Sequence, residues 1–466
     1  MFKMKLFILI LFKFIRRQIR WVGLILILSL FVAFLQIRFN LFNPVNRLSE
    51  GFVGTYQEHD IPEEVTRLLS ENLVIMDSAG RFKPNLVETW DVNKDATSFK
   101  FVLREGLVWA DGSKLKSADL EFNIPGVEIS TPDERTIQFK LKESYSPFPS
   151  LLTKPIFKKG TKLGTGPYQI KKIEKSRIFI TKLTLEGLKD DLPKVYIRFY
   201  PNEKVAQAGF YMGEIQALFG VSNPKIFTKS ATTDIKQKTD YSKIVTILYN
   251  TKDPLLSNRA LRQALSYQSP KIDKEEEANA TYPKFHWAYN EGAKGYISNP
   301  DEAGKAFERA KTNLTEEKLA ENILLTSTPN LEEVAKKVIG NWKQLGLNFN
   351  LRVESGIPQN FQALLITQSI PYDPDQYFLW HSTQTNTNLS KYSSDCCPQS
   401  ARVDKDLEDG RKAVNEEDRK TSYLDFQKTL MEDAPATFLY FPKHNIVYLK
   451  KAEKNLDRVL KLQLPD

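Results

Sequence analysis

The stretch NILLTSTPNLEEVAKKVIGNWKQLGLNFNLRV, residues 322–353, decides the fold class of this chain. It opens with a short apolar run over 322–327, and apolar residues then recur every three or four positions over 331–345, as on one face of a helix. Gly346 is a predicted helix C-cap, and apolar residues alternate over 349–353 as in a strand. Strand, helix and strand within about 30 residues form a βαβ unit, which predicts an α/β fold with parallel pairing.

The first half of the chain is instead rich in predicted strands. Apolar side chains alternate at the start of 98–109, and alternation returns over 137–141 and 195–199. Further along, a long helix is predicted over 416–432, and ATFLYFPKHNIVYL (436–449) is interpreted as one final strand. The chain thus combines a strand-rich part, a βαβ part and a C-terminal strand that has no sequence neighbour to pair with.

The positive charge of the chain is concentrated at its N-terminus. Of the net +9, seven charges come from the basic residues of 1–40, a segment without any acid, which leaves +2 for everything else. A body of such low net charge has no general affinity for polyanions, and we expect no nucleic-acid partner.

An uncharged apolar run, WVGLILILSLFVAFLQI, follows at 21–37. About 17 to 20 such residues span a bilayer core. Because six basic residues precede the run, the positive-inside rule predicts a cytoplasmic tail over 1–20 and an extracytoplasmic body after a linker over 38–50. The alternative is a cleaved signal peptide, but no small-x-small cleavage site follows. We therefore expect a single-pass signal anchor in the cell membrane.

Sequence motifs for catalysis or cofactor binding are absent. The chain has no G-x-S-x-G elbow, no P-loop and no dinucleotide fingerprint, so we expect neither an enzyme nor a cofactor. Its only cysteines, Cys396 and Cys397, are adjacent, which leaves two thiols or an occasional vicinal bridge as alternatives. Four scattered histidines lack metal-ligand spacing, so no metal site is predicted.

One segment nevertheless has the composition of a site: IPYDPDQYFLWHSTQ, residues 370–384. Asp373 and Asp375 flank Pro374, which favours a turn in which an Asp bonds its own backbone. Contact with a ligand is the second interpretation. A catalytic carboxylate pair is the third, since residues i and i+2 could reach the near end of the separation that glycosidases use.

Five motifs, in this order and spacing, resemble the family 5 solute-binding proteins of ABC importers, which include oligopeptide-, dipeptide- and nickel-binding receptors. The motifs are LLSENLVIMDSAGRFKPNLVETW (68–90), FKFVLREGLVWADGSKLKSADLEF (99–122), LGTGPYQI (163–170), ILYNTKDPLLSNRALRQALSY (247–267) and PYDPDQY (371–377). The resemblance runs from about Gly51 to Tyr448, nearly the whole predicted extracytoplasmic part.

The resemblance implies a bilobal clamshell like that of periplasmic binding proteins, of the class C type. A strand-rich lobe I would comprise 51–259 plus 435–466, and a βαβ lobe II would comprise 260–434. Two chain crossings, near 250–258 and 434–440, would form the hinge. The expected partners are a peptide or similar small solute, ABC permease subunits, and the membrane through the N-terminal helix. The chain would act as a monomer.

The predicted ligand-binding residues lie in two segments: Tyr56, Gln57 and Glu58 in lobe I, and Tyr372, Asp373, Trp380 and His381 in lobe II. Aromatic walls with a few polar groups suit an extended ligand. The alternatives are a core position for Trp380 and an internally satisfied His381. Trp90 and Trp109 are interpreted as packing residues of lobe I.

One position departs from the peptide-binding members of the family. In those members, an Asp that holds the free amine of the peptide lies three residues before the first Asp of the D-P-D segment. In this chain the matching position is occupied by Ile370. Either another carboxylate, such as Asp373 or Glu58, replaces it, or the ligand has no free amine at that place. Alternative functions are a tethered receptor or sensor, binding of a non-peptide solute, and a hydrolase on a borrowed scaffold.

Overall fold

The computed structural model describes residues 27–31, 46–224, 227, 231–384, 389–393, 397 and 399–464. Of the predicted membrane anchor, only 27–31 lie in this part, and they are helical. The rest of the anchor and the tail 1–20 lie outside it. No helix within the described ranges is long and apolar enough to cross a membrane.

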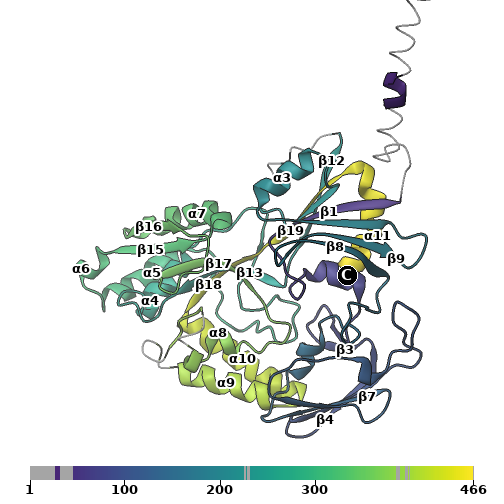
Figure 1. Cartoon of the computed structure of the whole chain (residues 1–466). Coiled ribbons are helices and arrows are strands. Elements are labelled where there is room, and N and C mark those ends of the chain that lie inside the picture. Colours follow the sequence, from purple (N-terminus) through teal and green to yellow (C-terminus); the bar gives the residue numbers. More distant parts are fainter. Residues whose placement is uncertain are drawn as a thin grey trace, which may run out of the picture.

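The first large sheet has seven strands in the order β12-β19-β11-β1-β10-β9-β8 (Figure 1). Its strands are β1 (Arg47–Val53), β8 (Tyr168–Ser176), β9 (Phe179–Gly187), β10 (Lys194–Tyr200), β11 (Ala217–Phe219), β12 (Thr233–Thr239) and β19 (Lys443–Leu449). Helices α2 (Glu63–Leu69) and α11 (Glu453–Gln463) cover one face, and α3 (Glu203–Tyr211) covers the other. This sheet forms the body of lobe I.

The second large sheet has six strands in the order β14-β18-β13-β17-β15-β16. Its strands are β13 (Lys243–Tyr249), β14 (Glu276–Glu277), β15 (Asn322–Ser327), β16 (Asn348–Val353), β17 (Ala363–Ser369) and β18 (Ala436–Phe441). Alternate residues of β13 face opposite layers, so the sheet is buried on both sides. Helices α4 (Arg259–Tyr267), α5 (Pro300–Lys311) and α7 (Glu332–Trp342) pack on one side, with the short α6 (Glu316–Leu319) nearby.

The other side carries α8 (Tyr377–Trp380), α9 (Ser400–Lys412) and α10 (Glu416–Asp433). The predicted βαβ unit is confirmed, because β15 and β16 pair in parallel on either side of α7. Gly346 ends this helical stretch in the left-handed region at φ 80°, where only glycine is unstrained. The long helix predicted over 416–432 is α10.

A third unit, not foreseen from the sequence, divides the strand-rich lobe. A four-stranded sheet in the order β4-β5-β7-β6 and a β2-β3 hairpin form it. Its strands are β2 (Val74–Met76), β3 (Phe82–Pro84), β4 (Val87–Val92), β5 (Ser98–Leu103), β6 (Val127–Ser130) and β7 (Thr136–Leu141). The unit has a core of its own, built on aromatic residues such as Phe101 and Phe139 and including Trp109, as expected. We call it the small domain.

The chain passes between the two large sheets twice, and both passages differ from the predicted positions. The first lies between β12 and β13, at 240–242, earlier than the predicted 250–258, because β13 belongs to the second sheet. The second lies at Pro442. The interpretation of 436–449 as one strand is therefore wrong: β18 joins the second sheet and β19 the first. Proline has no N–H to continue a ladder, which fits its place between two sheets.

Candidate functional site

A cavity of about 560 Å³ lies between the two lobes, beside both crossings. Lobe I contributes Glu63, Glu64 and Arg67 from α2, His444 from β19, and Gln463 and Leu464 at the end of α11. Lobe II contributes Ser369, Ile370 and Tyr372, and residues 238–243, which comprise the first crossing and the adjoining ends of β12 and β13, complete the wall. We call this space the interlobe cavity.

Tyr372 spans the interlobe cavity. Its hydroxyl donates a hydrogen bond to Glu63 Oε2 across the lobes at 2.8 Å, and Arg67 holds the other oxygen of Glu63 at 2.6 Å. Burial, followed by the negative charge of Glu63, raises the pKa of Tyr372 to about 12. The phenol therefore keeps its proton and remains a donor at neutral pH, so this bond directly joins lobe I to lobe II.

The two carboxylates of the DPD segment form ion pairs inside lobe II, and Asp373 Oδ2 is buried without a hydrogen-bond partner. Asp373 Oδ1 lies 2.6 Å from the guanidinium of Arg419, and Asp375 Oδ2 lies 2.9 Å from that of Arg411. Asp373 Oδ1 also accepts from the backbone N–H of Asp375 at 3.0 Å, so the turn interpretation is confirmed. Because each carboxylate is neutralised by an arginine, the pair offers no free general base.

The remaining predicted residues of lobe II point inward. The Trp380 side chain is completely buried in the core of the second sheet, and its indole N–H donates to Gln376 at 2.8 Å. His381 is 3% exposed; its ring stacks on Tyr377 and its Nε2 lies 3.3 Å from Glu408. In this structure neither side chain lines the interlobe cavity.

The predicted lobe I residues lie in the loop that precedes α2. The Tyr56 ring packs against Phe199, and its hydroxyl donates to Val53 O at 2.9 Å. The backbone N–H of Gln57 bonds to the Asp60 carboxylate, and Glu58 forms ion pairs with Lys162 and Lys175. None of the three belongs to the wall of the interlobe cavity, and their role as ligand contacts remains a prediction.

Sequence reasoning missed the residues that lobe I does contribute. Glu64, His444 and Gln463 line the interlobe cavity, and none had been singled out. The helix α11 had a detectable signal, because apolar side chains at Leu456, Val459 and Leu460 repeat at helical spacing. Its place beside the cleft depends on packing and could not be read from that spacing.

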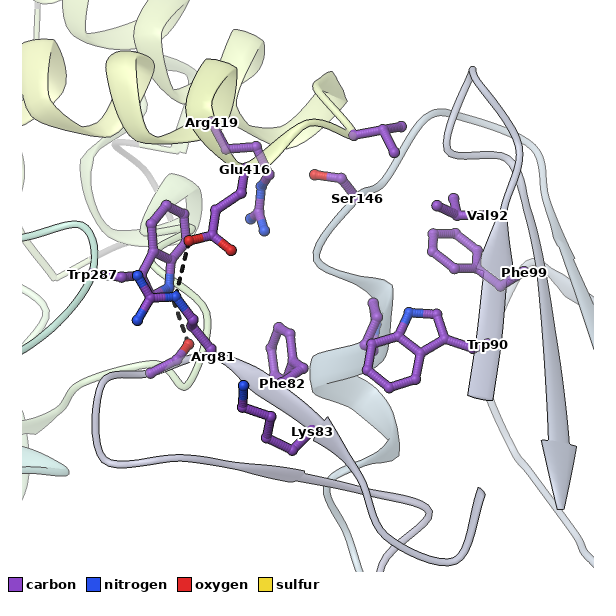
Figure 2. A pocket seen from close by; sticks show the side chains of 13 residues that line it. Arg81, Phe82, Lys83, Trp90, Val92, Phe99, Ser146, Trp287, Glu416 and Arg419 are labelled. Atoms are coloured by element: carbon purple, nitrogen blue, oxygen red, sulfur yellow. Dashed lines mark hydrogen bonds and ion pairs between the residues drawn. The ribbon is translucent and has the colours of Figure 1, made fainter. Parts of the chain in front are cut away.

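A second cavity, of about 270 Å³, separates the small domain from lobe II (Figure 2). One wall is apolar and comes from the small domain, where Phe82, Trp90 and Phe99 face the space. On the opposite side, Arg81 forms an ion pair with Glu416 of α10 at 2.9 Å. Trp90, expected to be a packing residue only, thus also borders this cavity.

Hydrogen bonds to backbone carbonyl oxygens fasten the small domain to lobe II around the second cavity. Trp287 donates its backbone N–H to Ala79 O at 2.8 Å and its indole N–H to Gly80 O at 3.0 Å. Gly80 has φ +83°, and a Cβ there would lie 2.3 Å from the His286 ring, so no larger residue fits. Ser146 N bonds to Arg411 O at 2.8 Å on the far side. The two lobes are therefore in contact at both ends of the cleft.

The described residues contain no group of three or more His, Cys, Asp or Glu side chains that could hold a metal ion. His286 is buried, and desolvation lowers its pKa to about 4. Cys397 takes part in a disulfide bond, and Cys396 lies outside the described part.

Comparison with known proteins identifies relatives over most of the chain. The family model described as bacterial extracellular solute-binding proteins, family 5 Middle, matches residues 81–389. The oligopeptide-binding protein AppA of Bacillus subtilis (strain 168) is 23% identical over 479 residues, covering 86% of this chain and 86% of the relative. The dipeptide-binding protein of Escherichia coli (strain K12) is 22% identical over 437 residues, covering 76% of this chain and 80% of the relative.

Solved structures share the fold. NikZ from Campylobacter jejuni in complex with Ni(L-His) superposes with a TM-score of 0.68 at 21% identity, covering 87% of this chain and 94% of that chain. AppA from Bacillus subtilis in complex with a nonapeptide gives a TM-score of 0.62 at 18% identity, covering 87% of this chain and 95% of that chain. At such identities the similarity establishes the bilobal α/β architecture.

Proposed function

The chain belongs to the bacterial extracellular solute-binding proteins of family 5, and we propose that it captures short peptides between its lobes and delivers them to the permease of an ABC importer. Membership confirms the resemblance carried by the five motifs. In this proposal the protein performs no covalent chemistry. Its function is reversible binding, coupled to closure of the two lobes.

The observation that carries the proposal is the interlobe cavity itself. Its walls come from both lobes, and its volume of about 560 Å³ lies within the range of about 300 to 1,000 Å³ typical of small-ligand sites. Two relatives, whose alignments cover more than three quarters of this chain, are named as an oligopeptide-binding and a dipeptide-binding protein. A ligand in this space would touch α2 on one side and 369–372 on the other.

The architecture also suggests how capture would be transmitted. The polypeptide passes from one large sheet to the other at 240–242 and at Pro442, and these two crossings can absorb a hinge rotation. A ligand that contacts both walls binds the closed state more tightly and shifts the population toward it. Closure would then present both lobes together to the permease.

Membrane attachment is part of the proposal. The apolar segment 21–37, preceded by basic residues, would keep the body on the outer side of the cell membrane as a monomer. A tether raises the effective concentration of the receptor near its permease, so a freely diffusing pool is not needed.

The test is binding by the full chain, purified in detergent micelles without refolding. We expect native mass spectrometry to reveal co-purified peptides and calorimetry to give micromolar affinity for members of a mixed di- to pentapeptide panel. Ni(L-His) serves as the comparison ligand, because the structure of NikZ in complex with this chelate superposes on this chain with a TM-score of 0.68. Tight binding of the chelate with no peptide binding would refute the peptide proposal in favour of a metal chelate.

Replacing Tyr372 by phenylalanine is expected to weaken ligand binding. The change removes the hydroxyl that bonds Glu63 across the lobes and leaves the ring in place. A hydrogen bond to a charged group contributes about 1.5 kcal/mol, which corresponds to roughly tenfold in Kd. Calorimetry with one bound peptide measures the change. The matched control is Tyr196→Phe, on an exposed strand position of lobe I, which should leave Kd unchanged.

A further inference from the structure

One end of lobe I gathers the start of β1 and three connections of the chain. The connections are 188–193 between β9 and β10, 212–216 between α3 and β11, and 450–452 between β19 and α11. Backbone bonds hold them beside β1, since Gln216 N–H donates to Ser49 O at 2.7 Å and Leu449 N–H donates to Gln216 O at 2.8 Å. On α11, the Asn455 amide donates to Arg47 O at 3.1 Å. We call this the entry end, because the chain enters β1 here, next to α11 (Figure 1).

Large apolar side chains at the entry end are exposed to solvent. Leu188 is 42% exposed, Tyr211 64% and Met212 71%, and the last is the highest value among the large apolar side chains of the described part. Single exposed apolar residues are ordinary on a protein surface. Three of them on two connections at the same end, however, form a surface that gains free energy when it leaves water.

The unpaired charges at the entry end are mostly basic. Exposed lysines that form no ion pair with a described residue are Lys189, Lys450, Lys451 and Lys454. Of the nearby acids, Glu214 and Glu453 are held in ion pairs within lobe I, and Asp190 and Asp191 are exposed. The entry end is therefore locally positive, although the body as a whole has little net charge.

The length of chain before β1 limits which surface can reach the membrane. Only the nine residues 38–46 separate the predicted anchor from Arg47, and they span at most about 30 Å when fully extended. The entry end is attached directly to this tether. The interlobe cavity lies at the other end of the same strands, because His444 is near the start of β19 and Lys450 follows its last residue. Six residues of strand separate the two by about 20 Å.

We propose that the entry end is a docking surface for the lipid bilayer that carries the anchor. The lysines would meet anionic phosphate groups, and the side chains of Tyr211 and Met212 would enter the interfacial layer, where a tyrosine ring with one polar end is well placed. The inference rests on the membrane attachment that is part of the proposed function. In the docked position the interlobe cavity faces away from the bilayer, toward the medium from which the solute arrives.

The arrangement of these residues favours a lipid surface over a protein partner. The basic and apolar side chains are distributed over three connections along one end of a sheet. Within the described residues they line no shared pocket that would hold the anchor side chain of a protein. A bilayer surface is broad, anionic and tolerant of register, so it matches such a distribution. Binding to it increases with buried apolar area and with the number of basic groups.

The test cuts the tether after the body has folded. A site for a specific protease is inserted after Phe42, and the full chain is reconstituted into vesicles of phosphatidylcholine, alone or mixed equally with phosphatidylglycerol. After cleavage, flotation separates the vesicle-bound body from the free body. We expect most of the cleaved body to remain on the anionic vesicles at low salt. It should leave the phosphatidylcholine vesicles, and high salt should release it from both.

Substitutions then locate the surface. Lys450→Gln, Lys451→Gln and Lys454→Gln together should lower the partition coefficient on anionic vesicles about a hundredfold, because each lysine near such a surface contributes about fivefold. Met212→Ser should lower the coefficient on both kinds of vesicle, since it removes an inserted apolar side chain. An unchanged coefficient in Met212→Ser would overturn the insertion of this end of α3.

The matched control carries three lysine substitutions on the small domain, Lys94→Gln, Lys100→Gln and Lys140→Gln. These lysines are also exposed and form no ion pair with a described residue, so the total charge changes equally. The control should bind anionic vesicles as the unmodified body does. Because all six side chains are exposed, both triple variants should unfold at the same midpoint as the unmodified chain.

The outcomes separate this proposal from the proposed function. Complete release of the cleaved body from anionic vesicles, or equal retention of the two triple variants, overturns the docking surface and leaves membrane attachment and peptide capture standing. A full chain that does not float with vesicles before cleavage overturns membrane attachment and the docking surface with it. Peptide capture is measured separately by calorimetry in micelles, so its failure would not be confused with either result.

Discussion

Replacing Arg262 by methionine is expected to lower the free energy of unfolding of lobe II by about 3 to 5 kcal/mol, because several buried acceptors would each lose their donor at a cost of about 1 to 3 kcal/mol. Arg262 is 0% exposed and lies on α4, beneath the end of α10. Its guanidinium donates to the carbonyl oxygens of Leu256, Ser257, Asp433 and Ala434 at 2.6–3.1 Å. Methionine fills much of the volume but leaves four buried acceptors without a donor.

The charge is present under ordinary conditions, since burial lowers the pKa of Arg262 only to about 10. Chemical unfolding of the full chain, followed by the fluorescence of the lobe II tryptophans, measures the loss. Arg402→Met is the control, because that side chain is 57% exposed and should change stability by less than about 1 kcal/mol. Equal unfolding midpoints for Arg262→Met and the unmodified chain would contradict the structural role assigned to this arginine.

Replacing Glu50 by glutamine is expected to stabilise lobe I above pH 7 and to flatten its pH dependence. Glu50 is completely buried, and desolvation raises its pKa from 4.5 to about 8. Below about pH 4.5 the carboxyl is protonated in both the folded and the unfolded chain. As the pH rises, the unfolded chain ionises first, so stability falls by about 1.4 kcal/mol per pH unit until the folded group ionises near pH 8.

The loss accumulated between pH 5 and pH 7.5 is about 3 kcal/mol. Glutamine cannot ionise and can still bond to Gln463, so the difference in unfolding free energy between Glu50→Gln and the unmodified chain should grow with pH over this window. Glu128→Gln on the exposed edge strand β6 provides the control and should show no such trend. A difference that does not change with pH would mean that the folded carboxyl ionises normally.

Periodicity predicted the elements of this fold better than their assembly. The βαβ unit over 322–353 was readable because burial on one face of α7 imposes the helical spacing of its apolar side chains. The segment 436–449 shows the limit. It is apolar on both sides of Pro442, and that pattern does not encode which sheet each half will join. The separate core of the small domain was also missed, because the alternation of apolar residues in its strands does not encode which sheet those strands will join.

The candidate site was harder to predict than the fold. Trp380 and His381 have the composition of a binding site, but the helical layer under the second sheet buries both. Conversely, Gln463 meets Glu50 across a sequence separation of 413 residues, and no local signal marks that contact. Only the folded arrangement of α2, β19 and α11 brings the lobe I wall together.

The position of β18 and β19 has a consequence for how the chain folds during synthesis. β19 lies between β12 and β11, and β18 lies between β14 and β13, so each large sheet receives an interior strand from residues 436–449. The small domain, whose strands lie between 74 and 141, can form early from local contacts. Until residues 436–449 emerge from the ribosome, however, both large sheets present unpaired edges, which are prone to aggregation and suited to holding by a chaperone.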